Sequence, residues 1–284
     1  MVLKNIALSG GGFMGYALVS SLEELEKYEG TINIQSICGT SVGAMVGGLW
    51  AVGYTAEELK KIMFELNFEE LIKDSAVPYI NLYEKYGMYE AINFEQLIEK
   101  LIEEKTQRKF CTFSQINKNL TIVATNINLQ KPVFFNKETT PKLAISKAIR
   151  MSCGYPIIFT PVLYEGHLYS DGGDSLSFPI SYFSNLDETI GITFVRHNEN
   201  TDGSLKSHVE IQNMTDYIIA LGSTLTRATY ICQLEEKYIK RTIFVKINEP
   251  ISSMQFNITN EQKNAIYESG RTSILKQLPN ILKN

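Results

Sequence analysis

Short apolar runs alternate with amphipathic segments along the first fifth of the chain. Residues 5–9 form an apolar run that ends in glycines, and residues 32–37 alternate between apolar and polar, so both predict strands. Residues 16–28 place leucines at helical spacing, and residues 42–52 have the length and composition of a buried helix. Strand, glycine turn and helix thus occur twice in succession, which predicts a parallel sheet with crossover helices.

The remainder of the chain continues this mixture of periods. Helical patterns occupy residues 56–73, 94–105, 141–149, 216–240 and 259–278. Strand patterns occupy residues 120–125, 132–135, 162–164, 167–169, 189–195 and 242–247. Asn93 is the expected N-cap of the second of these helices, Pro141 the first residue of the third, and a capping box at 259–262 opens the last. Because no repeat or linker interrupts the pattern, we expect one domain over residues 1–284, a three-layer α/β/α fold with a mostly parallel central sheet.

Composition excludes several classes of function. The chain has 284 residues and a formal net charge of -4, so no basic excess suits a nucleic-acid partner. The four cysteines are isolated and the three histidines lack metal-ligand spacing, so we expect reduced thiols, a cytoplasmic location and no metal. Residues 31–56 carry no charge, but their five glycines and polar residues favour a strand and a buried helix over a transmembrane segment.

The sequence Gly39-Thr40-Ser41-Val42-Gly43 is a G-x-S-x-G motif between a predicted strand and a predicted helix. A sharp turn there holds the serine in a strained conformation and exposes its hydroxyl above the sheet. The flanking glycines remove the Cβ clashes of such a turn. A plain glycine turn with a capping serine is the alternative interpretation.

A second motif, Gly10-Gly11-Gly12-Phe13-Met14-Gly15, also lies between a strand and a helix. A dinucleotide site would need an acidic residue at the end of the second strand, and a P-loop would need Gly-Lys-Ser/Thr; neither is present. Consecutive glycine N–H groups at a helix N-terminus can instead form an oxyanion hole. A purely structural loop is the remaining alternative.

The third motif, Ser170-Asp171-Gly172-Gly173, follows the strand at 167–169. A carboxylate at a strand end next to two glycines can approach another part of the backbone closely. An Asp that caps its own turn is the alternative.

Together the three motifs resemble the patatin-like phospholipase family, and the resemblance extends over most of the chain. The segment from Arg150 to Pro156 is similar to the one that this family carries between its serine and its aspartate. The resemblance implies Ser41 as nucleophile, Asp171 as base, and the amides of Gly10, Gly11 and Gly12 as oxyanion hole. The glycines that support these motifs are Gly15, Gly39, Gly43, Gly172 and Gly173.

That resemblance implies a phospholipase A type of reaction on phospholipids or glycerolipids, without cofactor, and transient contact with a membrane surface. An acyltransferase and a catalytically silent lipid-binding scaffold remain alternatives, as does a triad completed by His197 or His208. Met14 departs from the family, in which a basic residue often stands there. Residues expected to border an acyl trough are Met45, Leu49, Trp50, Met63, Phe64, Leu66 and Phe68.

Overall fold

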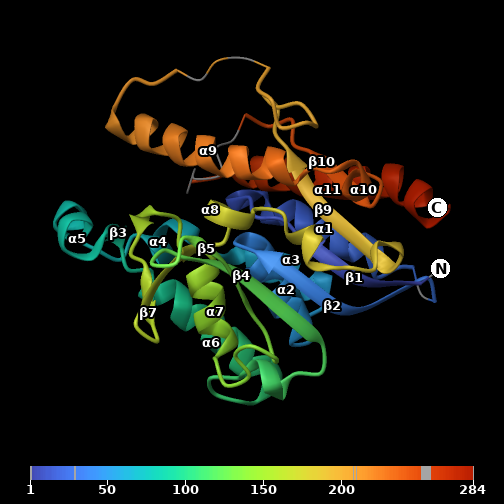
Figure 1. The fold of residues 1–284 in the computed structure, drawn as a ribbon, viewed down its shortest axis with the longest axis horizontal. Helices are drawn as coiled ribbons and strands as arrows, with labels where there is room; N and C mark the ends of the chain where they lie inside the picture. The colour runs from blue at the N-terminus through green and yellow to red at the C-terminus, as the bar shows by residue number, and fades with distance from the viewer. Residues whose placement is uncertain (1, 29, 207, 209, 251–256, 284) are drawn as a thin grey trace.

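A computed structural model describes residues 2–28, 30–206, 208, 210–250 and 257–283, and its centre is a mixed β-sheet of eight strands (Figure 1). The described strands are β1 (Leu3–Leu8), β2 (Ile32–Thr40), β3 (Gly87–Tyr89), β4 (Asn119–Asn126), β5 (Lys131–Phe135), β6 (Ile157–Phe159), β7 (Val162–Tyr164), β8 (His167–Asp171), β9 (Thr189–Val195) and β10 (Thr242–Lys246). The order in the sheet is β10-β9-β1-β2-β4-β8-β7, with β5 paired to β4.

Strands β10, β9, β1, β2 and β4 are parallel, whereas β5, β8 and β7 pair antiparallel at one side. The described helices are α1 (Gly15–Leu25), α2 (Val42–Ala51), α3 (Ala56–Glu65), α4 (Phe68–Ile72), α5 (Pro78–Lys85), α6 (Ile92–Thr106), α7 (Ile145–Ser152), α8 (Gly173–Leu176), α9 (Met214–Gln233), α10 (Glu236–Ile239) and α11 (Asn260–Lys283). The predicted α/β class with a mostly parallel central sheet is confirmed.

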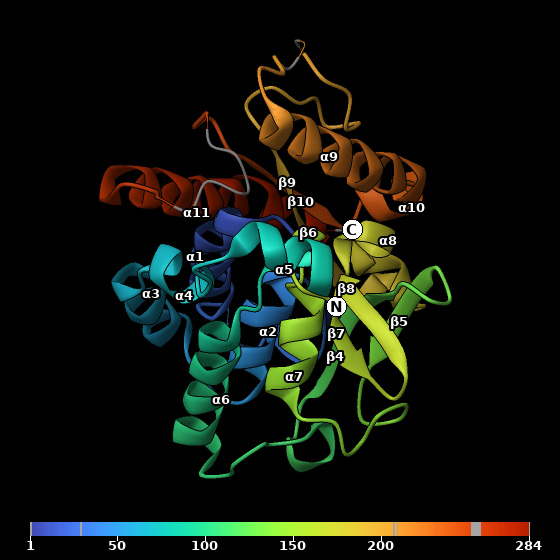
Figure 2. The ribbon, with the colours of Figure 1, turned by 90° about the vertical axis from the view of Figure 1, so that its left-hand side faces the viewer.

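Both faces of the sheet are covered, because successive strand residues point to opposite sides. In β1, Ile6 and Leu8 are fully buried in the larger core, together with side chains of α1, α2, α7 and α11. Ala7 between them belongs to a smaller core on the other face, with Leu176 of α8 and Phe178. In Figure 2, α6 and α7 lie in the lower half of the molecule and α9 lies at its top.

Two predicted helix starts are wrong, and distant contacts explain both. Helix α6 begins one residue before Asn93, and the carboxylate of Asp74 accepts the backbone N–H of its first residue at 2.8 Å. Helix α7 begins four residues after Pro141, because Ala144 forms a β-bridge with Thr112 that keeps the chain extended. In both cases a partner remote in sequence decides where the helix begins.

The other helical predictions are confirmed with changed limits. The stretch 216–240 is two helices, α9 and α10, and the stretch 56–73 is likewise divided into α3 and α4. Helix α11 opens at the predicted capping box, in which Thr259 and Gln262 exchange hydrogen bonds of 3.0 and 3.2 Å. It continues past the expected end at 278, through Pro279.

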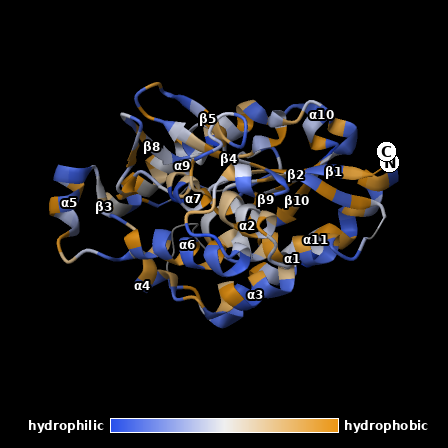
Figure 3. Ribbon diagram, turned by 90° about the horizontal axis from the view of Figure 1, so that it is seen from below, coloured by the Kyte–Doolittle hydropathy of each residue, from blue (hydrophilic) through white to orange (hydrophobic). Residues whose placement is uncertain are grey.

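None of the helices in the described part of the chain is both long enough and apolar enough to cross a bilayer. Helix α2 is largely apolar in Figure 3 and lies at the centre of the molecule, whereas α3, α4 and α5 carry hydrophilic positions at its edge. The uncharged stretch 31–56 is therefore β2 followed by the buried helix α2, as predicted.

Candidate active site

Ser41 stands on a tight turn between β2 and α2. Its backbone is at φ 53° and ψ -124°, a conformation that residues other than glycine rarely adopt, so the turn holds the residue under strain. A Cβ on Gly39 would lie 2.4 Å from the carbonyl oxygen of Gly43, and a Cβ on Gly43 would lie 2.3 Å from that of Leu8. Only glycine fits at either position, and this is the strand-turn-helix arrangement that the G-x-S-x-G motif predicts.

The register of the sheet brings Ser41 and Asp171 together. Strand β2 ends with Thr40 opposite Val123 of β4, and β8, running the other way, ends with Asp171 opposite Ala124. Strand β5 pairs with both Val123 and Ala124 from the other edge of β4. Strands β2 and β8 therefore meet end to end along one edge of β4, and the Ser41 hydroxyl donates to Asp171 Oδ2 at 2.7 Å.

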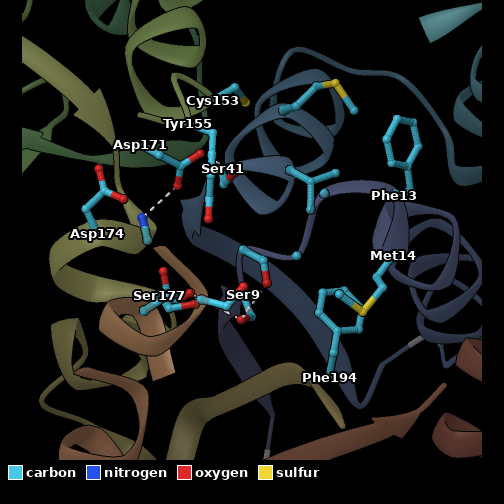
Figure 4. Close-up of a pocket in the computed structure, with 18 of the residues that line it drawn as sticks. Ser9, Phe13, Met14, Ser41, Cys153, Tyr155, Asp171, Asp174, Ser177 and Phe194 are labelled. Carbon is cyan, nitrogen blue, oxygen red and sulfur yellow. Dashed lines mark hydrogen bonds between the residues drawn. The ribbon is translucent and has the colours of Figure 1, made fainter. Parts of the chain in front are cut away.

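The carboxylate of Asp171 is buried and held by its own loop (Figure 4). The N–H of Gly173 donates to Asp171 Oδ1 at 2.8 Å. A Cβ on Gly172 would lie 2.3 Å from the Val123 carbonyl oxygen, so this loop needs glycine to press against β4. Burial raises the pKa of Asp171 to about 6, although the hydrogen bonds from Ser41 and Gly173 oppose the rise.

A second carboxylate, Asp174, lines the same cavity beside Asp171. Burial and the neighbouring charge of Asp171 raise the pKa of Asp174 to about 7, and its hydrogen bond from Ser170 partly offsets them. Asp171 accepts two hydrogen bonds, whereas Asp174 accepts one. When the two carboxyl groups together carry a single negative charge, that charge therefore resides preferentially on Asp171.

Ser152 fixes the backbone at the serine. The Ser41 N–H donates to Ser152 Oγ at 2.8 Å, and the Ser152 hydroxyl in turn donates to the carbonyl of Val123. Its side chain is fully buried. The sequence signal for this residue was its place in the segment from Arg150 to Pro156, but its role was not predicted.

The glycine-rich loop follows β1 and passes next to Ser41. The N–H of Gly10 donates to the Ser177 carbonyl at 2.9 Å, so that amide is occupied within the fold. Gly12 has φ 56°, which suits glycine, and the short 3-10 helix Gly12–Met14 leads into α1. Within the described part of the chain, the N–H groups of Gly11 and Gly12 donate to no other residue.

The glycines of this loop also permit close packing around it. A Cβ on Gly11 would lie 2.6 Å from the ring of Phe194, and one on Gly15 would lie 2.4 Å from Val42 Cγ2. Met14 is buried, and its methyl carbon would lie 3.3 Å from a Cβ on Gly11. Where a basic residue often stands in the family, an apolar side chain therefore packs against the loop.

Ser41 and Asp171 lie in a cavity of about 190 Å³ with one apolar and one polar side. The expected trough residues Met45, Met63 and Phe68 line it. Of the other expected ones, Leu49 is core, Trp50 donates to Glu26 at 2.8 Å, and Phe64 and Leu66 border a different hollow. Apolar lining residues that the sequence did not indicate are Phe13, Phe94, Phe159 and Phe194.

The polar side of the cavity comes from β9, the loop after it and α9. Arg196, Glu199 and Arg227 line this side, as does Tyr155. No motif marked Arg196, Glu199 or Arg227, which are more than 150 residues from Ser41 and stand in no recognisable sequence. Tyr155 lies in the segment from Arg150 to Pro156, but its place in the cavity was not predicted.

The three histidines lie away from this arrangement. His197 and His208 are exposed, and none of the three, all in the described part of the chain, lines the cavity. Both oxygens of Asp171 accept hydrogen bonds from Ser41 and Gly173 instead. Among the described residues, no group of three or more His, Cys, Asp or Glu side chains is placed to hold a metal ion.

A sequence model of the family described as Patatin-like phospholipase matches residues 6–184. An uncharacterised protein of Acanthamoeba polyphaga mimivirus is 51% identical over 284 residues, 99% of this chain and 96% of that protein. "Probable lipid hydrolase 463L" of Invertebrate iridescent virus 6 is 31% identical over 190 residues, 62% of each chain.

Two solved structures share the fold. VipD from Legionella pneumophila has a TM-score of 0.64 at 16% identity, covering 98% of this chain and 67% of that one. ExoU of Pseudomonas aeruginosa has a TM-score of 0.57 at 16% identity, covering 99% and 54%. The chain belongs to the patatin-like phospholipase family, a family of lipid hydrolases.

Proposed function

We propose that this protein hydrolyses carboxylic esters of phospholipids or related glycerolipids through an acyl-Ser41 intermediate. The observation that carries the proposal is the 2.7 Å hydrogen bond from the Ser41 hydroxyl to the buried carboxylate of Asp171, on a strained turn inside a largely apolar cavity. Family membership supports the lipid as substrate.

In this mechanism Ser41 Oγ attacks the ester carbonyl while its proton passes to Asp171 Oδ2. The tetrahedral intermediate expels the alcohol, which takes the proton from Asp171. Water then attacks the acyl-serine, with Asp171 accepting its proton and returning it to Ser41 Oγ. A pKa of about 6 makes Asp171 a better base than an ordinary carboxylate while leaving it ionised near neutral pH.

The oxyanion of each tetrahedral intermediate would be bound by glycine N–H groups. Of the three amides first expected in this role, we propose those of Gly11 and Gly12, since Gly10 already donates to Ser177. Each donor of this kind contributes roughly 3 kcal/mol to the transition state. These amides are backbone groups, so Met14 leaves them in place.

Contact with a lipid surface would involve the projecting tip at α5, at the left end of Figures 1 and 3. Tyr79, Tyr83 and Tyr86 are 81%, 88% and 65% exposed, and Ile80 is 54% exposed. Tyrosine suits a membrane interface because its ring is apolar and its hydroxyl is polar. Strand β3, which follows α5, pairs with β6, whose Phe159 lines the cavity.

Fluorophosphonate labelling followed by peptide mass mapping tests the assignment. We expect one adduct on Ser41, lost in Ser41→Ala together with hydrolysis of p-nitrophenyl butyrate, while Ser114→Ala, at an exposed serine outside the cavity, retains both. An adduct on another serine, or full activity of folded Ser41→Ala, would refute the mechanism. Release of free fatty acid from a labelled phospholipid, compared with formation of a new ester, distinguishes hydrolysis from acyl transfer.

A further inference from the structure

Two arginines converge on the polar side of the cavity. Arg227 Nη2 lies 2.8 Å from Glu199 Oε1, and Arg196 Nη1 lies 3.6 Å from the same oxygen. The backbone N–H of Arg196 also donates to Glu199 Oε2 at 3.1 Å. One carboxylate thus orients two guanidinium groups, and the cluster has a net charge of +1.

This cluster lies next to the proposed catalytic dyad. Helix α9 packs on α8, and the Cγ2 of Thr226, the residue before Arg227, is 3.8 Å from where a Cβ on Gly173 would be. Gly173 is the residue whose N–H holds Asp171. The same cavity wall therefore continues from the carboxylate to the arginines.

Tyr155 experiences the charges of both the carboxylates near the dyad and one of the arginines. Burial and the charges of Asp174 and Asp171 raise the pKa of Tyr155, whereas the charge of Arg196 lowers it. The phenol thus lies in the fields of both the carboxylates and an arginine. A molecule that reaches Ser41 through this cavity would also meet the arginines.

Arg227 has one buried donor, Nη1, without a hydrogen-bond acceptor among the described residues. A buried charged donor without an acceptor is unfavourable, and an anion in the cavity would satisfy it. Planar guanidinium groups bind phosphate oxygens in pairs, which an ammonium group cannot do in the same way.

We propose that Arg196 and Arg227, oriented by Glu199, form a subsite for the phosphodiester of a phospholipid head group. A phosphodiester carries one negative charge and matches the net +1 of the cluster. The apolar side of the cavity, with Met45, Phe68 and Phe94, would take an acyl chain at the same time. This inference rests on the proposed function, because it assigns the class of lipid to the same site.

The test measures binding, so it does not depend on turnover. In the Ser41→Ala background, calorimetric titrations compare diheptanoyl phosphatidylcholine with diheptanoylglycerol, which has the same chains and no phosphate. We expect Arg227→Gln to lower the ratio of the two affinities roughly tenfold to hundredfold, the worth of one or two charge-assisted hydrogen bonds. Arg271→Gln, which removes an arginine from an ion pair with Glu24 outside the cavity, is the matched control and should leave the ratio unchanged.

Further variants cover the case in which Arg227→Gln does not fold. Arg196→Gln should lower the ratio in the same direction, and Arg227→Lys should lower it less because it keeps the charge. An unchanged ratio in every folded arginine variant overturns the proposal. So does tight binding of inorganic phosphate without any preference for phosphatidylcholine over the diacylglycerol, which would indicate a site for free phosphate. Intact, arginine-dependent phospholipid binding without hydrolysis by the wild-type protein would instead refute the proposed function and retain the subsite.

Discussion

Replacing Asp171 with asparagine should stabilise the protein at neutral pH while it abolishes activity. The side chain has nearly the same shape, its Oδ1 can accept from the Gly173 N–H, and its Nδ2 can donate to the Ser41 hydroxyl. Burial without a charged partner raises the pKa of Asp171 from 3.8 to about 6, so the folded state prefers the neutral acid. An asparagine removes the need to ionise a buried group.

The size of this effect follows from the pKa difference of about 2. At about 1.4 kcal/mol for each pKa unit, the ionised carboxylate reduces the free energy of unfolding by up to about 3 kcal/mol. The folded pKa is above the unfolded one, so the favourable contribution of the neutral acid is fully present below pH 3.8 and is lost as pH rises through about 6. The advantage of Asp171→Asn should therefore be greatest above pH 7 and vanish below pH 4.

Urea denaturation of wild type and Asp171→Asn at a series of pH values checks this prediction. The control is Asp202→Asn, because Asp202 is exposed and hydrogen bonds from Ser204 lower its pKa, so no gain is expected there. Ester hydrolysis by Asp171→Asn should fall at least a hundredfold, as for loss of a general base. A variant that is less stable than wild type at pH 7.5, or a difference that does not depend on pH, would refute the argument from burial.

Two further predictions concern the proposed base, Asp171, and the tight turn that holds Ser41. The kcat/KM for p-nitrophenyl butyrate should fall tenfold per pH unit below about pH 6, since Asp171 must be ionised to accept the proton; a plateau down to pH 4 would contradict this. Gly43→Ala should lower the free energy of unfolding by about 3 kcal/mol or more, because its Cβ meets the backbone oxygen of Leu8 at 2.3 Å. Gly48→Ala in the same helix meets only the flexible end of Ile149 at 2.9 Å, so thermal denaturation should show a change of no more than about 1 kcal/mol; equal losses would refute the steric argument.

The order of elements and the strand-turn-helix setting of Ser41 could be predicted from the sequence, because both are written in local patterns. Apolar runs of strand length separated by amphipathic helices allow few arrangements other than a parallel sheet. Glycines on both sides of a serine indicate a tight turn for steric reasons that hold in any fold. That residues 1–284 form one domain stays a prediction.

Contacts between remote segments were decided only by the tertiary structure. Nothing near Asn93 or Pro141 reveals Asp74 or the bridge between Ala144 and Thr112. Nothing near Gly10 shows that its amide would be occupied by a carbonyl that is 167 residues away in sequence.

The cavity likewise depends on contacts between segments that are remote in sequence. Arg227 comes next to the catalytic dyad because α9 packs on α8, and side-chain pairing across such an interface leaves no periodic trace in the sequence. Local steric and hydrophobic rules determine which elements form and where the serine turn lies. The close packing of those elements determines which charges face the serine, and hence which substrate the cavity can hold.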